Sequence, residues 1–256
     1  IRSWIPGQGS EAFVIPSDQD IAAFQGVFLN VKENNFENMQ SVLTPFNYSF
    51  FKFYDQARTE TLYVIVENTP LQRGWGTFIY CPNSLKNIMV EVPHPIWDID
   101  TWEMGINTFM TINAKWFIMA GTHRYANSDG SSDMAHVTQS IFHTAHTTIA
   151  SYRAVQIHGF SKTNNPGYPD VVMSNGTRYP PNEIYNLQTN YRSEGFSVGV
   201  YSASTSSALG NLGATTNKQG QWSNSHGKLF YHIEHDNPLR TESVKMNQAI
   251  KALQRS

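Results

Sequence analysis

The sequence has a single cysteine, few charges and no long hydrophobic run, and each absence excludes a class of protein. Cys81 is the only cysteine, so no disulfide within the chain can stabilise the fold. Charged residues make up 15% of the chain, and 18 Lys and Arg nearly balance 20 Asp and Glu. Nucleic-acid binding normally needs a basic excess, so DNA and RNA are not expected partners. The longest apolar runs, 62–66 and 116–120, are far shorter than the ~20 residues that span a bilayer.

The chain is large and apolar enough to form its own core. Hydrophobic residues make up 40% of its 256 residues, and a chain of this length buries about three quarters of its surface without cross-links. The polar remainder is mostly uncharged Ser, Thr, Asn and Gln, and the sequence begins at Ile1 without a charged leader. These two features favour a processed, extracytoplasmic or secreted protein.

The order of expected elements predicts an α/β fold. Ser17 or Asp18 can cap a helix in which Ile21, Phe24 and Phe28 form one apolar face. From residue 88 onward, expected strands alternate with helices, which predicts a three-layer sandwich with a central mixed, mostly parallel sheet covered by helices on both faces. The strands are expected at 61–67, 76–81, 88–92, 115–120, 154–157, 170–173, 196–201 and 228–233.

We expect a single domain over residues 1–256, in which residues 1–87 form an N-terminal accessory layer. Asp133 is expected to cap a helix that reaches Ala150, with His136 on its solvent-facing side. The segment 202–225 is rich in Ser, Gly, Thr and Asn and is expected to be a loop. Loops of that length in compact domains are usually functional or mobile.

Ionisable residues follow several of the expected strands. His94 and Asp98 follow the strand at 88–92, and His158 follows the strand at 154–157. Glu234 follows the strand at 228–233, with His232 two residues earlier and therefore on the same side. Because ligands of open α/β sheets bind beyond the carboxyl ends of the strands, we expect these side chains to converge on one rim of the sheet.

Two imidazoles and a carboxylate are a suitable ligand set for a divalent cation. His94, Asp98 and His158 supply three protein ligands and leave a fourth position for water. Glu234 is the candidate general base and acid, and Arg124 is the candidate clamp for a substrate carboxylate or an oxyanion.

Each of these residues also has a structural interpretation. His94 can simply end a strand in a rigid turn between two prolines, and Glu234 can belong to a solvated strand end. Asp98 can instead cap the helix that begins there, in which case Asp100 is the alternative ligand. His158 can be a core histidine satisfied by a main-chain carbonyl. Arg124 can pair with a carboxylate in its own loop, either Asp129 or Asp133.

A nucleophilic mechanism has less support in the sequence. The serine-rich tract 202–207 lacks the flanking glycines of a nucleophile elbow. Cys81 follows an expected strand, which leaves a thiolate-histidine pair open, but no sequence feature predicts a lowered pKa for its thiol. The glycine-rich phosphate-binding motifs G-x-x-x-x-G-K-[ST] and G-x-G-x-x-G are also absent from the sequence.

Four motifs follow one another along the chain. They are Val92-Pro93-His94-Pro95 with Asp98, His123-Arg124 with Asn127, Gln156-Ile157-His158-Gly159, and His232-Ile233-Glu234 followed by Leu239-Arg240. In this order they resemble the zinc carboxypeptidase-like hydrolases, in particular the branch of N-formylglutamate amidohydrolases and phage poly-γ-glutamate hydrolases. The first motif of that family usually places its acidic ligand three residues after the histidine, whereas position 97 here is Trp.

The resemblance implies an α/β sandwich with one zinc ion per chain. It implies zinc ligation by His94, Asp98 and His158, substrate binding by Arg124 with Asn127, and catalysis by Glu234. We expect His123, His232 and Arg240 to add substrate contacts.

The expected function is therefore a zinc-dependent hydrolase that cleaves an amide bond of the peptide, N-acyl amino acid or γ-glutamyl type. Arg124 and Arg240 favour a small-molecule or peptide-like substrate that carries a carboxylate. Two alternatives stay open: a non-catalytic ligand-binding protein on the same fold, and a metal-dependent esterase or phosphoesterase.

Overall fold

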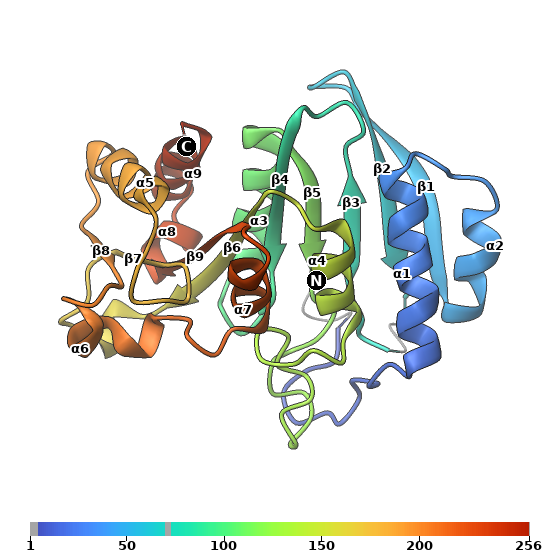
Figure 1. The fold of residues 1–256 in the computed structure, drawn as a ribbon, viewed down its shortest axis with the longest axis horizontal. Helices are drawn as coiled ribbons and strands as arrows, with labels where there is room; N and C mark the ends of the chain where they lie inside the picture. The colour runs from blue at the N-terminus through green and yellow to red at the C-terminus, as the bar shows by residue number, and fades with distance from the viewer. Residues whose placement is uncertain (1–4, 70–72, 256) are drawn as a thin grey trace.

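A computed structural model describes residues 5–69 and 73–255, which are built around one nine-stranded sheet (Figure 1). The strand order is β1-β2-β3-β5-β4-β6-β9-β7-β8. The strands are β1 Tyr48–Asp55, β2 Glu60–Glu67, β3 Thr77–Tyr80, β4 Lys86–Val92, β5 Ala114–Met119, β6 Arg153–Phe160, β7 Val171–Ser174, β8 Val198–Val200 and β9 Leu229–Asp236.

The four middle strands β5, β4, β6 and β9 are parallel, and antiparallel pairings flank them on both sides. On one side, β1, β2 and β3 form an antiparallel meander that joins β5; on the other, β7 is antiparallel to β9 and parallel to β8. The sheet is therefore mixed, as predicted. Because the middle strands are parallel, their carboxyl ends lie at one edge of the sheet.

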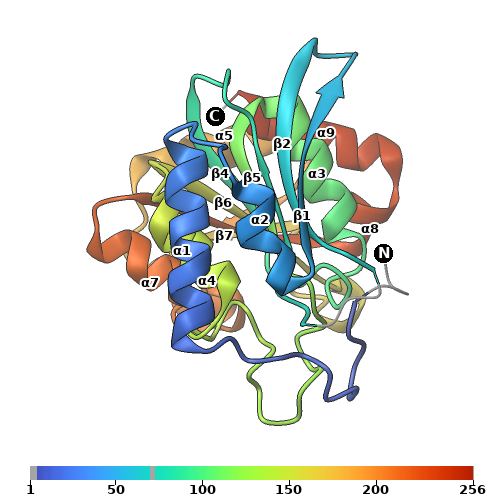
Figure 2. The same ribbon diagram turned by 90° about the vertical axis from the view of Figure 1, so that its right-hand side faces the viewer.

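Helices cover both faces of the sheet. The α-helices are α1 Asp18–Lys32, α2 Met39–Leu43, α3 Thr101–Ile112, α4 Ile141–Ile149, α5 Asn182–Ser193, α6 Ser206–Leu209, α7 Lys218–Ser225, α8 Asn237–Thr241 and α9 Ser243–Gln254, and the 3-10 turns are η1 Thr44–Phe46, η2 Lys162–Asn164 and η3 Gly210–Leu212. Figure 2 shows α1, α4 and α7 on one side of the sheet and α3, α8 and α9 on the other. Each side has its own apolar core, which confirms the predicted three-layer sandwich.

In the part of the chain that the structure describes, none of the helices combines the length and the apolarity needed to cross a membrane.

On the face covered by α4 and α7, three neighbouring strands change from apolar to polar toward their carboxyl ends. Side chains on one face alternate along a strand, so equivalent positions of β4, β6 and β9 form rows across the sheet. The apolar row is Met89, Ala154 and Phe230; the polar row is Glu91, Gln156 and His232; the last row pairs His158 with Glu234. Polar groups therefore gather at the edge where the parallel strands end.

The structure corrects several sequence-based boundaries. The helix expected from Asp133 begins at Ile141 instead, with the Ser140 side chain accepting a hydrogen bond from the first turn. The segment 202–225 is not a simple loop, because it contains α6, η3 and α7. Strands β6 and β9 extend beyond the expected ends, so His158 and Glu234 lie within strands rather than after them.

A matched pair of glycines tests how closely α3 packs on β4. A Cβ added at Gly105 on α3 would lie 2.3 Å from Val92 Cγ2, whereas one at Gly26 on α1 would meet nothing within 4 Å. We expect Gly105→Ala to lower the free energy of unfolding by about 1–3 kcal/mol through overpacking. Gly26→Ala should raise it by up to about 1 kcal/mol because alanine is the better helix former. Chemical denaturation measures both, and equal effects would contradict the close contact.

Candidate metal centre

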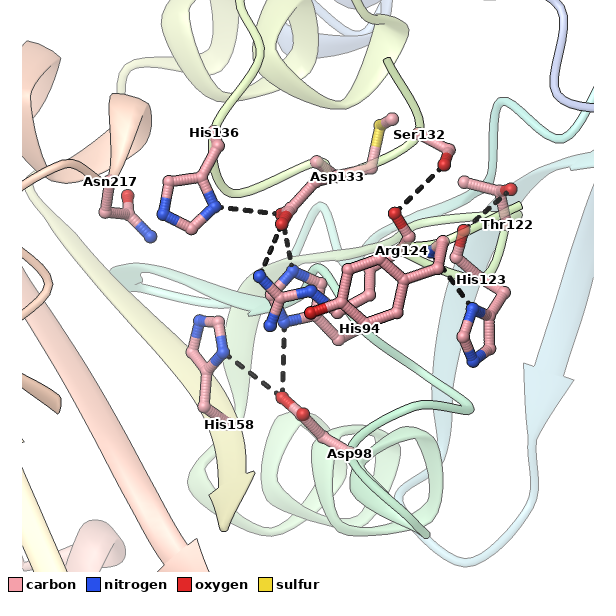
Figure 3. Close-up of polar contacts among 12 residues, drawn as sticks. His94, Asp98, Thr122, His123, Arg124, Ser132, Asp133, His136, His158 and Asn217 are labelled. Atoms are coloured by element: carbon pink, nitrogen blue, oxygen red, sulfur yellow. Dashed lines mark hydrogen bonds and ion pairs between the residues drawn. The ribbon is translucent and has the colours of Figure 1, made fainter. Parts of the chain in front are cut away.

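Two histidines from distant parts of the chain meet one buried carboxylate. Asp98 Oδ2 lies 3.3 Å from His94 Nδ1 and 3.2 Å from His158 Nδ1, and 60 residues separate Asp98 from His158. The centroids of the two imidazole rings are 4.9 Å apart. All three side chains are buried, and the structure thus brings together the three residues that the sequence predicted as ligands (Figure 3).

The turn after β4 places His94 and Asp98 on the same side. The Asp98 N–H donates to the His94 carbonyl oxygen at 3.1 Å, which closes one tight turn before α3 begins. The Asp98 side chain does not cap α3. Asp100 occupies the N-cap position with a left-handed backbone (φ 60°) and makes no side-chain capping bond. Of the two acidic candidates, Asp98 is therefore the one that joins the histidines.

Asp98 and His158 hold the charge states that a metal ligand set needs, whereas the pKa of His94 is shifted the other way. Burial opposes the charge of Asp98, but the nearby His94 and His158 rings lower the pKa of its carboxyl well below the usual range. Burial and the neighbouring His232 lower the pKa of His158 to about 4, so this ring is neutral at pH 7. For His94, burial is outweighed by the carboxylates of Asp98 and Asp133, which raise its pKa. An ionised carboxylate and a neutral imidazole are the forms that bind a metal.

The outer nitrogens of both histidines already have partners. His94 Nε2 lies 2.9 Å from Asp133 Oδ1, and His158 Nε2 lies 2.7 Å from Gln156 Oε1. Metal-bound histidines are oriented in this way, with the distal nitrogen hydrogen-bonded to an acceptor. The ligand atoms of His94, Asp98 and His158 all lie within 4.8 Å of one another. This donor set fits the zinc ion that the sequence predicts.

A second group overlaps the first and shares His158. His158, His232 and Glu234 also offer ligand atoms within 4.8 Å of one another. His232 Nε2 is 3.2 Å from Glu234 Oε1. Glu234 Oε2 and His232 Nδ1 are buried and have no hydrogen-bond partner among the described residues. Because buried polar atoms are nearly always paired, these two atoms mark a place where water, substrate or an ion is expected.

These groups share a cavity of about 250 Å³. Its lining includes all three predicted ligands, Glu234 and Arg124. The lining also includes residues 210–212 and 214–217, called the 210–217 wall below. Part of the segment 202–225, which the sequence predicted to be functional or mobile, therefore lines the same cavity as the candidate metal ligands.

Asp133 connects three residues of the cavity, of which the sequence considered only Arg124 as its partner. Its carboxylate contacts His94 Nε2 at 2.9 Å, His136 Nδ1 at 3.0 Å and Arg124 Nη2 (Figure 3). Burial opposes its charge, but hydrogen bonds from His136 and His94 lower the pKa of the carboxyl. The predicted helix cap at Asp133 is wrong because this carboxylate is used by side chains. His136 therefore lines the cavity rather than the surface of a helix.

Arg124 lies where the sequence prediction requires a clamp. Its guanidinium is fixed by Asp133, the second of the two loop partners considered for it. Its Nε is buried and has no hydrogen-bond partner among the described residues. The side chain lines the cavity, and its contact with a substrate stays a prediction.

His123 and Asn127 make structural contacts. The His123 Nδ1 accepts a hydrogen bond from the Tyr125 N–H at 3.0 Å, and its ring packs edge-on against Trp97. Asn127 accepts from the Phe13 N–H at 3.2 Å and donates to the Phe13 carbonyl at 2.9 Å. Asn127 thus holds the N-terminal segment in place. Substrate binding by either residue stays a prediction.

Arg240 is buried against main-chain carbonyls. It donates to the carbonyl oxygens of His235 at 3.1 Å, Phe160 at 3.0 Å and Ile99. A Cβ at Gly159 would lie 2.3 Å from the guanidinium carbon, which explains the glycine at this position. Arg240 thus links the ends of β6 and β9 to the turn before α3, and it lines a neighbouring cavity of about 540 Å³. Its predicted contact with substrate stays a prediction.

No protein-family model matches the chain, and no curated protein sequence matches it. Among solved structures, an N-formylglutamate amidohydrolase from Ralstonia eutropha JMP134 is similar with 10% identity over 71% of this chain and 96% of that chain, at a TM-score of 0.44. An aspartoacylase family protein from Mesorhizobium loti shares 10% identity over 80% of this chain and 66% of that chain, with a TM-score of 0.44. The LapA aminopeptidase of Legionella pneumophila shares 12% identity over 96% of this chain and 73% of that chain, with a TM-score of 0.34.

Proposed function

We propose that this protein is a zinc-dependent hydrolase that cleaves an amide bond, with the ion held by His94, Asp98 and His158. One observation carries the proposal: two histidine Nδ1 atoms and one carboxylate oxygen converge beside a cavity that Glu234 also lines, and Glu234 Oε2 has no hydrogen-bond partner among the described residues. A zinc ion bound there would polarise the scissile carbonyl and lower the pKa of a water molecule to near 7.

Glu234 is positioned to move the proton of the attacking water. Its Oε2 accepts that proton, and the same oxygen then delivers it to the amine nitrogen as the C–N bond breaks. The products are a carboxylic acid and an amine. Hydrogen bonding from His232 Nε2 to Glu234 Oε1 holds the carboxylate, and β-sheet register places Glu234 directly beside His158 on the neighbouring strand.

Arg124 and the 210–217 wall would bind the substrate. Asp133 holds one Nη of Arg124, which leaves the other donors of the guanidinium for a substrate carboxylate or for the oxyanion. The 210–217 wall contributes the uncharged polar side chains of Thr215, Thr216 and Asn217. A cavity of about 250 Å³ suits a small-molecule or peptide-like group.

Glu234 favours an amide over an ester as the substrate. An amine must be protonated before it can leave, whereas an alcohol leaves with less help from an acid. A binding protein without turnover has no need for a buried carboxylate oxygen that lacks a partner. Two results would contradict the proposal: cleavage of esters or phosphate esters but not of amides, or binding of a ligand without turnover.

Metal content distinguishes the two acidic candidates. Wild-type protein loaded with zinc under mild conditions should retain about one ion per chain, as a three-ligand site does. Asp98→Asn should retain far less, because it removes the anionic ligand, while Asp100→Asn should retain as much as the wild type. Elemental analysis after gel filtration measures all three. Equal zinc in the two variants would remove Asp98 from the ligand set.

Glu234→Gln tests the proton-transfer step. The variant should lose about 10²-fold or more in turnover, because the amide cannot accept the proton, and should keep its zinc. Glu103→Gln, which removes an exposed carboxylate on α3, is the matched control and should keep full activity. The substrate panel consists of N-acyl amino acids, γ-glutamyl peptides, esters and phosphate esters. Unchanged turnover in Glu234→Gln would exclude it as the base, and loss of zinc would make it a ligand.

A further inference from the structure

The buried side chain of Gln156 contacts the candidate metal ligand His158, and the proposed function gives this glutamine no role. Gln156 is two residues before His158 on β6 and points to the same face of the sheet. It is fully buried and makes polar contacts with His158, Asn217 and Glu91. Burying an amide at the centre of a sheet costs more free energy than burying an aliphatic side chain. The contacts show what this amide does.

The orientation of the Gln156 amide follows from a main-chain donor. The Gly220 N–H donates to Asn217 Oδ1 at 2.9 Å, as part of the N-cap of α7. Because that atom is an acceptor, the other side-chain atom of Asn217 is its nitrogen, which donates to Gln156 Oε1 at 2.6 Å. The oxygen of Gln156 therefore faces Asn217.

Glu91 fixes the same orientation from the other side. Gln156 Nε2 donates to Glu91 Oε2 at 2.9 Å, and Glu91 is completely buried. His146 Nδ1 lies 2.6 Å from Glu91 Oε1, and Ser223 Oγ lies 2.9 Å from His146 Nε2. Ser223, His146 and Glu91 have the order of a nucleophilic triad, but all three are buried and none lines the cavity of about 250 Å³. Instead, Ser223 and His146 orient Glu91, and Glu91 accepts the hydrogen bond from the Gln156 amide.

The amide in turn determines which nitrogen of His158 carries the hydrogen. Gln156 Oε1 can only accept, and it lies 2.7 Å from His158 Nε2. Nε2 therefore carries a hydrogen, and Nδ1 is the ring nitrogen left to offer a lone pair. That lone pair faces Asp98 Oδ2 at 3.2 Å. Two lone-pair atoms at this distance repel each other unless a cation or a proton lies between them.

We propose that Gln156 is a positioning residue that holds His158 in the tautomer with hydrogen on Nε2, so that Nδ1 is the atom that binds the cation. The inference rests on the proposed function for the identity of that cation as zinc. It predicts that Gln156 contributes to zinc affinity without touching the ion, as partners of metal-bound histidines generally do.

Gln219 provides a matched control. It is equally buried and belongs to the same polar layer, with its Oε1 3.4 Å from Gln156 Nε2 and its Nε2 donating to the Met134 carbonyl at 3.0 Å. No hydrogen bond joins it to His158 in the described part of the chain. Gln156→Leu and Gln219→Leu therefore remove the same kind of side chain from the same layer, and only Gln156→Leu removes the partner of a ligand.

The test measures the affinity of the full-length protein for Zn²⁺ by competition with a chromogenic chelator. Gln156→Leu should weaken Zn²⁺ binding by about 10–100-fold, whereas Gln219→Leu should stay within about 3-fold of the wild type. Thermal unfolding of the metal-free proteins shows whether both variants lose similar stability. If the wild type binds Zn²⁺ and the two variants bind it with equal affinity, the proposed role of Gln156 is wrong and the proposed function still stands.

Nuclear magnetic resonance of the metal-free wild type tests the tautomer directly. Long-range ¹H–¹⁵N spectra of protein labelled at its histidine rings should show His158 with hydrogen on Nε2, with its signals identified by their loss in His158→Gln. A ring with hydrogen on Nδ1 and none on Nε2 would overturn the inference even if Gln156→Leu fails to fold. A wild type that binds no Zn²⁺ would overturn the proposed function, and the spectra would still decide the role of Gln156.

Discussion

The buried carboxylate of Asp98 between two imidazole Nδ1 atoms is the interaction on which the rest of the site depends. A buried charge is costly unless groups of opposite charge or hydrogen-bond donors surround it. His94 reaches Asp98 from the turn after β4, and His158 reaches it from β6. The parallel pairing of β4 with β6 fixes the separation of those two segments. The register of two strands therefore sets the geometry of the candidate metal centre.

At this edge of the sheet, buried polar side chains take the place of apolar ones and form hydrogen bonds that orient the candidate ligands. Next to the apolar row, toward the carboxyl ends of the strands, Glu91 and Gln156 are fully buried, and each has several hydrogen-bond partners. A fully satisfied polar network fixes one arrangement of side chains more strictly than apolar packing does. On the other side of the site, Asp133 has the same relation to His94 that Gln156 has to His158. The Nε2 atoms of the two histidines thus face two different acceptors, a carboxylate of Asp133 and an amide oxygen of Gln156.

The sequence predicts the fold and the convergence of His94, Asp98 and His158 better than it predicts the hydrogen-bond partners of these residues. Alternation of strands and helices gave the sandwich, and the positions of His94, Asp98 and His158 near strand ends placed them at one rim. The contacts of Asp133 with His94 and His136 were not predicted, because the apolar positions after Asp133 have the spacing of a helix and an aspartate before such a pattern usually caps it. Its actual partners include His94, 39 residues away, and local periodicity carries no information on such contacts.

Asn217 shows why a site of this kind cannot be divided into independent parts. Its Oδ1 caps α7, its Nδ2 fixes the Gln156 amide, and its side chain belongs to the 210–217 wall of the cavity. Through Gln156, the 210–217 wall of the cavity is two hydrogen bonds away from the candidate ligand His158. A substitution that shifts the start of α7 is therefore expected to act on this histidine as well as on the shape of the cavity. Because Asn217 belongs to the wall and also binds the Gln156 amide that contacts His158, the effects of substitutions in the wall and at His158 are not expected to add.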